Sequence, residues 1–174
     1  MTPKSKLRTY KWICYCAFML LCVVIQTTIL SGIDVMFCSP NLIPFIVAVI
    51  SLRDGVEDGM IAGIAGGLLC DGLYSGYEAF YTITLVVLAF GICLLNTIMY
   101  WKNYGMSLLN WVVIVIPMQF LHYCIYMLLQ GEGTISSLLY IIPGEILATL
   151  PFTPILYFII IRIGKRFEPE TAEE

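Results

Sequence analysis

Long apolar segments joined by short polar connections constrain the fold of this chain more than any other feature. Hydrophobic residues make up 60% of the 174 residues, charged residues make up 12%, and the mean hydropathy is +0.90. Soluble domains are far less apolar, so the sequence predicts an integral membrane protein. Because the polar connections are short, we expect one domain within the membrane and no sizeable domain outside it.

Six segments are apolar enough to be membrane helices, so the predicted fold is an all-α bundle of six transmembrane helices. They cover residues 12–31, 41–52, 59–74, 80–100, 107–129 and 137–161. The second and third are short for a hydrocarbon core of about 30 Å. We expect residues 36–41 to extend the second helix and neighbouring helices to shield it, with Pro40 and Pro44 near its first turn.

The positive charges predict how the six helices are oriented. All nine lysines and arginines lie before the first segment, between the second and third, between the fourth and fifth, or after the sixth. The positive-inside rule therefore places both termini in the cytoplasm. Residues 1–11 are then a basic cytoplasmic N-terminus, residues 12–166 the membrane domain, and residues 167–174 an acidic cytoplasmic tail.

Small residues recur at every fourth position in the third segment. This glycine ladder consists of Gly55, Gly59, Gly63 and Gly67, and the next step of four is Asp71. Residues four apart lie nearly one above another on a helix, so the ladder forms a face without side chains. In lipid such a face lets another backbone approach closely. The ladder therefore predicts a packing surface for another helix, either in the bundle or in a partner.

Two acidic residues within the apolar segments are candidates for function, because a carboxylate is costly in hydrocarbon. Asp71 lies toward the outer end of its helix, where it is predicted either to bond the backbone of residues 74–77 or to bond a partner. Glu145 follows Pro143 and Gly144, a pattern typical of a first helical turn. We therefore expect the sixth helix to begin at Pro143, after an apolar connection.

Other polar and reactive residues point to structural roles. His122 is expected to form a hydrogen bond between helices, and the cysteines show no metal-binding spacing, so we expect no metal and no cofactor. Ser75 and Gly76 lack the motif of a serine protease, and Asp71 lacks the further acidic ligands of a two-metal enzyme. The sequence favours a non-enzymatic binding or scaffolding protein, without a nucleic-acid partner. Pro151 and Pro154 predict a kink in the last helix.

Three segments resemble the MreD family of rod-shape-determining membrane proteins, and they follow one another along the chain as in that family. The residues from Gly63 to Gly76 run glycine-rich into Asp71 and then into the pair Ser75 and Gly76. The run Ser39, Pro40, Asn41, Leu42 is similar to the start of the family's short second span, with Arg53 and Gly55 following it. Residues 143–149, Pro154 and the basic residues 162–166 are similar to its last span. The connection 101–106 carries fewer charges than in the family, and the acidic tail is additional.

The resemblance implies a membrane adaptor of the bacterial cell-elongation machinery, or elongasome. MreD proteins bind the membrane-anchored protein MreC and, through it, are linked to MreB, RodA and a class B penicillin-binding protein. The implied role is to support lateral peptidoglycan synthesis and cell shape from the bacterial cytoplasmic membrane, where the chain also contacts lipids. The partner-packing residues would be Gly55, Gly59, Gly63, Gly67, Asp71, Ser75 and Gly76, with His122 and Glu145 as further polar residues within the membrane.

An alternative of a different class is the substrate-binding S-component of an energy-coupling-factor vitamin transporter. Those proteins also have six spans and cytoplasmic termini. The first segment of this chain lacks the repeated small residues expected for docking on the transporter, and its outer connections are poor in polar residues. The sequence therefore favours the adaptor.

Overall fold

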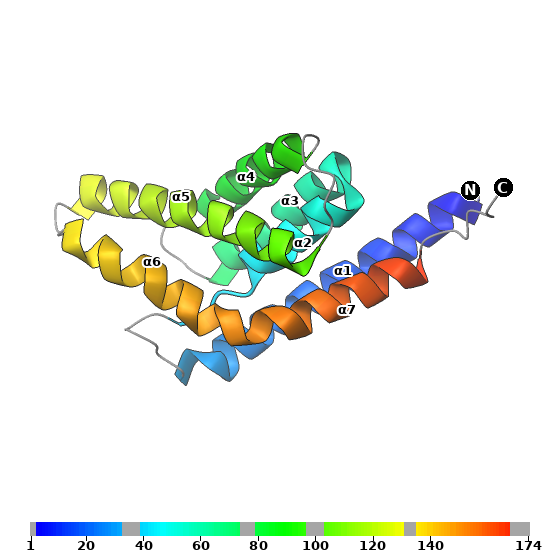
Figure 1. The fold of residues 1–174 in the computed structure, drawn as a ribbon, viewed down its shortest axis with the longest axis horizontal. Coiled ribbons are helices and arrows are strands. Elements are labelled where there is room, and N and C mark those ends of the chain that lie inside the picture. Colours follow the sequence, from blue (N-terminus) through cyan, green and yellow to red (C-terminus); the bar gives the residue numbers. More distant parts are fainter. Residues whose placement is uncertain (1–2, 33–38, 74–78, 97–102, 131–134, 168–174) are drawn as a thin grey trace.

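The computed structural model describes residues 3–32, 39–73, 79–96, 103–130 and 135–167. Over these ranges the chain forms helices and short connections and no strand (Figure 1). In chain order the elements are α1 (Pro3–Thr28), η1 (Leu30–Gly32), α2 (Ile43–Asp54), α3 (Val56–Leu73), α4 (Phe80–Asn96), α5 (Tyr104–Gln130), α6 (Ile135–Thr149), η2 (Leu150–Phe152) and α7 (Thr153–Arg166). The predicted all-α class is confirmed.

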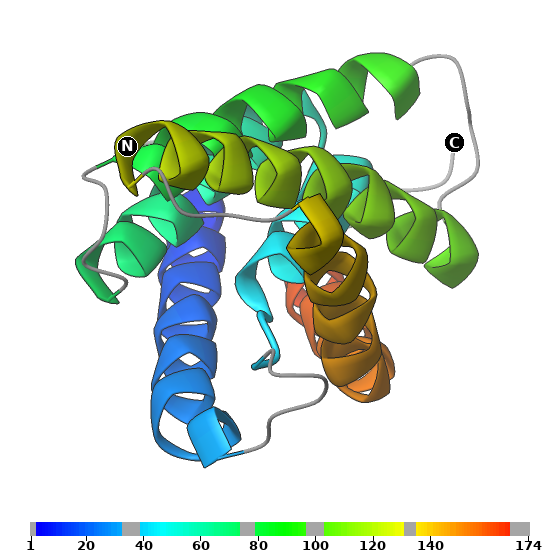
Figure 2. The ribbon, with the colours of Figure 1, turned by 90° about the vertical axis from the view of Figure 1, so that its left-hand side faces the viewer.

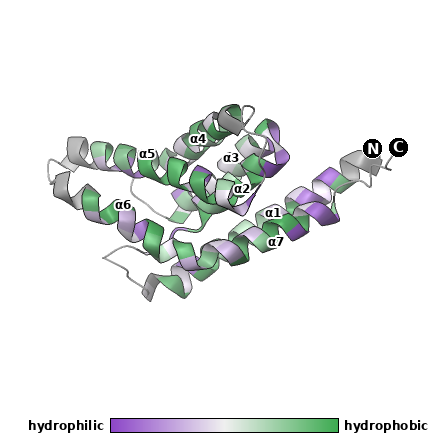
Figure 3. Ribbon diagram, in the orientation of Figure 1, coloured by the Kyte–Doolittle hydropathy of each residue, from purple (hydrophilic) through white to green (hydrophobic). Residues whose placement is uncertain are grey.

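Three helical stretches are long and apolar enough to cross a membrane. They are Leu7–Thr28, Tyr104–Ile125 and Leu139–Arg166, and Phe80–Leu94 is an apolar helix of shorter length. Large apolar side chains such as Ile13, Val87 and Phe158 point outward. Hydrophobic residues run along the helices, while hydrophilic residues gather where α1 and α7 approach the chain termini (Figure 3). This distribution is consistent with a membrane protein.

Helix α2 is the centre of the fold. All its residues from Ile43 to Leu52 are buried, and α1, α3, α4, α5 and α7 all contact it. A helix that is hydrophobic on every side needs neighbours, or lipid, all round. The prediction that neighbours shield the short second helix is therefore confirmed. In Figure 2 the start of α2 lies between α1 and α6.

The predicted extension of α2 is wrong where the structure describes it. Residues 39–42 are not helical, and residues 36–38 lie outside the described residues. The helix has 12 residues, about 18 Å at 1.5 Å per residue, so its first N–H groups lie within the bundle. Side chains accept the backbone N–H groups of the two residues just before the helix: the Leu42 N–H donates to Gln26 Oε1 at 3.0 Å, and the Asn41 N–H donates to Thr149 Oγ1 at 3.1 Å. Polar partners from α1 and α6 therefore replace the missing helical turn.

The last two helices correct the prediction for Pro143. Helix α6 begins at Ile135, so Pro143 lies inside it and Glu145 is not in a first turn. A proline is tolerated within a membrane helix because neighbouring groups can satisfy the freed carbonyl. The α-helix is instead interrupted by the 3₁₀ turn η2, which contains Pro151 and is followed by Pro154 in the first turn of α7. Figure 1 shows a bend between α6 and α7 at the predicted place.

Side-chain contacts show that α1 and α2 run in opposite directions. Asp54, at the end of α2, lies beside Lys11 near the start of α1, whereas Leu42 lies beside Gln26 near the end of α1. The hydrogen bonds of Arg53 to carbonyls of α7 bring the last turns of that helix to the same end. We call it the basic end; its described side chains are Arg8, Lys11, Arg53, Arg162, Lys165 and Arg166. The start of α1 and the end of α7 both lie toward this end (Figure 1).

Candidate functional site

The glycine ladder lies against helices of the same chain. A Cβ atom added at Gly63 would be 3.1 Å from the carbonyl oxygen of Leu85, and one added at Gly67 would collide with the backbone of Thr82. At Gly59 it would be 2.6 Å from Ser51 Oγ in α2. These glycines therefore allow α3 to approach α4 and α2 more closely than any side chain would permit.

Gly55 does not belong to this face. It lies between α2 and α3 with φ of 93° and ψ of −169°. Residues with a side chain rarely adopt this conformation, which glycine tolerates. The regular spacing from Gly55 to Gly59 thus has a different cause from the spacing within α3: Gly55 turns the chain between two helices that share only this residue as a connection.

Asp71 caps the first turn of α4. Its Oδ1 accepts the Tyr81 N–H at 2.8 Å, and its Oδ2 accepts the Thr82 N–H at 2.9 Å and the Thr82 hydroxyl at 2.6 Å. The first N–H groups of a helix have no helical acceptor, and a carboxylate there also meets the positive end of the helix dipole. The predicted bond of Asp71 to the backbone of residues 74–77 falls outside the described residues, as do Ser75 and Gly76. The backbone that Asp71 is seen to bond is that of α4.

Glu145 is the least exposed acidic residue in the described part of the chain, at 3% exposure. The side-chain amide of Gln119 in α5 donates a hydrogen bond to its Oε2, and the side chain of Asn41 also bonds the carboxylate. Thr149, one turn further along α6, holds the backbone of Asn41. Glu145 therefore belongs to a polar cluster where α5, α6 and the start of α2 meet.

Two acceptors in this cluster are left over. Glu145 Oε1 and Asn41 Oδ1 are buried without a hydrogen-bond donor among the described residues. A buried acceptor without a donor costs roughly 1–3 kcal/mol. The carboxyl and the amide lie on neighbouring elements, so a proton or a small hydrogen-bond donor held between them would satisfy both. These two acceptors are polar atoms without a donor in the described part of the chain, and they are buried among helices that are otherwise apolar.

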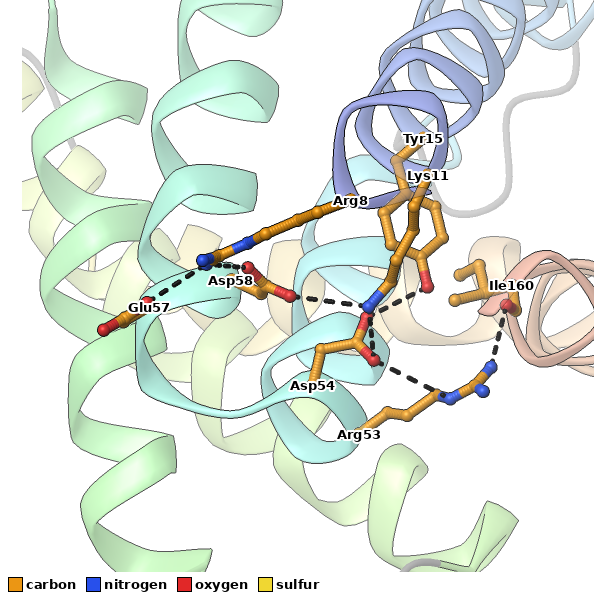
Figure 4. Close-up of polar contacts among 8 residues, drawn as sticks. All are labelled: Arg8, Lys11, Tyr15, Arg53, Asp54, Glu57, Asp58 and Ile160. Atoms are coloured by element: carbon orange, nitrogen blue, oxygen red, sulfur yellow. Dashed lines mark hydrogen bonds and ion pairs between the residues drawn. The ribbon is translucent and has the colours of Figure 1, made fainter. Parts of the chain in front are cut away.

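The basic end holds a network of ion pairs between α1 and the junction of α2 with α3 (Figure 4). Lys11 Nζ lies 2.9 Å from Asp54 Oδ1 and 3.4 Å from Asp58 Oδ2. Arg8 pairs with Asp58 at 2.9 Å and with Glu57 at 3.0 Å. Tyr15 donates its hydroxyl to Asp54 at 3.0 Å. From the sequence, the lysines and arginines predicted only how the chain is oriented in the membrane. The ion pairs could not be predicted, because their partners are far apart in the sequence.

Arg53 joins α2 to α7. Its Nη1 donates to the carbonyl oxygens of Ile160 and Ile161, at 3.3 and 2.6 Å, and its Nε lies 3.8 Å from Asp54 Oδ1. Gly164 makes this possible, because a Cβ at that position would collide with the guanidinium. The role of Gly164 was missed by the sequence analysis, since the two residues are far apart in the chain.

His122 lies beside the start of α4. Its ring is 5.3 Å from that of Phe80 and 5.9 Å from that of Tyr81, measured between ring centres. Tyr81 is also one of the two residues whose N–H groups Asp71 accepts. His122 therefore packs α5 against the same helix end that Asp71 caps.

Comparison with protein-family models, with curated proteins and with solved structures finds no match to this chain.

Proposed function

We propose that this protein is a non-enzymatic membrane adaptor of the bacterial cell-elongation machinery that binds the membrane helix of MreC. The observation that supports the proposal is where the residues of the MreD resemblance lie. Asn41 and Leu42 immediately precede α2, Arg53 lies in its last turn, and Gly63 and Gly67 pack α3 against α4. Thr149, in the last segment of the resemblance, bonds Asn41. Segments far apart in the sequence thus meet around one buried helix.

The distribution of charge supports the orientation that this function requires. Arg8, Lys11 and Arg53 lie at one end of the molecule, and the basic residues of α7 are at the same end. With that end in the cytoplasm, the chain crosses the bacterial inner membrane six times with both termini inside. Because α4 covers Gly63 and Gly67, we place the MreC helix on an outward-facing surface and assign the ladder to the adaptor's own packing.

Co-purification tests the proposal. The full chain is co-expressed with an affinity-tagged MreC from the same genome, solubilised in mild detergent and captured through the tag. We expect a stable complex in which lateral wall synthesis enzymes are recovered through MreC. An unrelated single-span protein with the same tag is the control and should capture nothing.

Two results would overturn the proposal. One is failure of MreC to capture a chain that elutes as a folded, monodisperse species by itself. The other is saturable thermal stabilisation of the purified chain by a water-soluble vitamin, which would favour a transporter S-component.

A further inference from the structure

A cavity of about 210 Å³ lies between α2, α5 and α7 at the basic end. It has room for several water molecules, since each occupies about 30 Å³ in the liquid. Its apolar lining residues are Val49, Leu52 and Ile161, and its polar ones are Arg53, Ser107, Tyr157 and Lys165. The position is distinct from both the Glu145 cluster and the contact between α3 and α4.

The walls of this cavity are positively charged. Arg53 and Lys165 line it, and no carboxylate is found among its lining residues within the described chain. Arg53 is held at the wall by its hydrogen bonds to the carbonyls of Ile160, drawn in Figure 4, and Ile161, and its Nε lies 3.8 Å from Asp54 Oδ1. Lys165 has no carboxylate within ion-pair distance in the part of the chain that the structure describes. An anionic group is the expected occupant.

The surroundings of the cavity select a lipid over a free anion. Tyr157, Ile161 and Lys165 are spaced by four residues, so they form one stripe along α7 that passes from apolar to cationic toward the basic end. Phe158, in the turn before Ile161, is 71% exposed, so an apolar surface of α7 adjoins this stripe. A lysine with a hydroxyl group beside it suits the phosphate of a phospholipid, and the adjoining apolar surface suits its acyl chains.

We propose that this cavity binds the phosphate of an anionic phospholipid headgroup, with Lys165 and Arg53 as its cationic walls and the acyl chains along the apolar surface of α7. Basic pockets between membrane helices on the cytoplasmic side bind anionic headgroups in this way. Tyr157 supplies a hydroxyl that can donate to a phosphate oxygen, while the Ser107 hydroxyl donates to the Asn103 carbonyl at 3.3 Å and adds a polar wall. Such a lipid would connect the buried helix α2 to α7 at the membrane surface.

Native mass spectrometry of the full chain in a non-ionic detergent tests the proposal. Phosphatidylglycerol, phosphatidylcholine with the same acyl chains, and inorganic phosphate are titrated separately. We expect one retained phosphatidylglycerol per chain, weaker retention of phosphatidylcholine and none of inorganic phosphate. The Lys165→Gln variant should bind phosphatidylglycerol about fivefold more weakly, as expected for the loss of one lysine beside an anionic headgroup.

Matched variants separate a site from general surface charge. Arg162→Gln removes the same charge from an exposed position on the same helix that does not line the cavity, so binding should change less than twofold. Lys165→Arg keeps the charge and should retain binding within about twofold. Equal losses in Lys165→Gln and Arg162→Gln would overturn the proposal, as would unchanged binding in Lys165→Gln. Retention of inorganic phosphate as tight as that of phosphatidylglycerol would exclude a lipid site.

Discussion

Asp71 and Thr82 are joined by two hydrogen bonds, one from the Thr82 N–H at 2.9 Å and one from its hydroxyl at 2.6 Å. The backbone of the same threonine is the surface against which Gly67 lies. Gly67 and Asp71 are four residues apart, so they share one face of α3. The glycine allows the approach of α4, and the carboxylate fixes where α4 begins.

Substitution of Gly67 by alanine should destabilise the protein. The added Cβ meets the Thr82 backbone, which cannot move without displacing α4, and overpacking of this kind costs typically 1–3 kcal/mol. Thermal unfolding of the purified chain in detergent measures the effect. Gly91→Ala in α4 is the control, because nothing lies within 4 Å of a Cβ there. Equal stability of the two variants would show that the close approach is not needed.

Removal of the Asp71 carboxylate should weaken the start of α4. Asp71→Ala leaves the N–H groups of Tyr81 and Thr82 without their acceptor, and loss of an N-cap costs about 0.5–2 kcal/mol. Asp71→Asn keeps one acceptor oxygen and should lose less. Thermal unfolding of both variants tests the order, and an Asp71→Ala chain as stable as the parent would contradict the capping role.

Glu145 should tolerate replacement by glutamine better than by leucine. Glutamine still accepts from Gln119, and its amide can donate to Asn41 Oδ1, which has no donor among the described residues. Leucine satisfies neither partner, so we expect a loss of roughly 1–3 kcal/mol or more. Thermal stability in detergent distinguishes the two. A Glu145→Gln chain that fails to fold while Glu145→Leu folds would contradict the arrangement of the cluster.

Lys11 should matter more for stability than Arg8. The side chains of Lys11 and Asp54 are 13% and 5% exposed, whereas those of Arg8 and Glu57 are 53% and 82% exposed. Breaking a largely buried pair costs about 3–5 kcal/mol, and an exposed pair contributes at most about 1 kcal/mol. Urea or thermal unfolding of Lys11→Met and Arg8→Met measures the difference. Adding Asp54→Asn to Lys11→Met should restore part of the loss, because the buried carboxylate that has lost Lys11 is then replaced by a neutral amide.

Cysteine labelling in intact cells tests the proposed orientation. In a chain whose native cysteines are replaced by alanine, a membrane-impermeant maleimide should label cysteines placed at Ser31 or Gly133. It should reach Asn103 or Thr171 only after permeabilisation. Labelling at Asn103 in intact cells would exclude six alternating spans.

The helices of this chain could be predicted from its sequence because lipid and protein interiors both require long apolar segments. The shielding of α2 was likewise predictable from its length, since the segment is too short to span a bilayer unaided. The prediction that a helix begins at Pro143 was wrong for a specific reason. A proline two residues before a glutamate has the same local appearance at a helix start and in the interior of a membrane helix. What distinguishes the two cases is that α6 already begins at Ile135, eight residues before the proline.

The partners of the candidate site residues could not be predicted, because they are set by contacts between distant segments. The sequence singled out Asp71, but its acceptor role depends on how α4 returns along α3. Gly164 gave no local signal, because its importance comes from Arg53, which is more than 100 residues earlier in the chain. The glycine spacing predicted a close helix contact; which helix would fill it was left open, and α4 does so.

The bond between Asn41 and Thr149 has a consequence for how the protein is made. The two residues are 108 positions apart, and at the usual 5–20 residues per second the ribosome needs roughly 5–20 s to travel between them. During that interval Asn41 has left the ribosome before Thr149, whose hydroxyl accepts the Asn41 N–H in the folded protein, has been synthesised. Nascent chains ending before Thr149 should therefore remain associated with the insertion machinery, which would hold a polar helix end that the finished protein encloses.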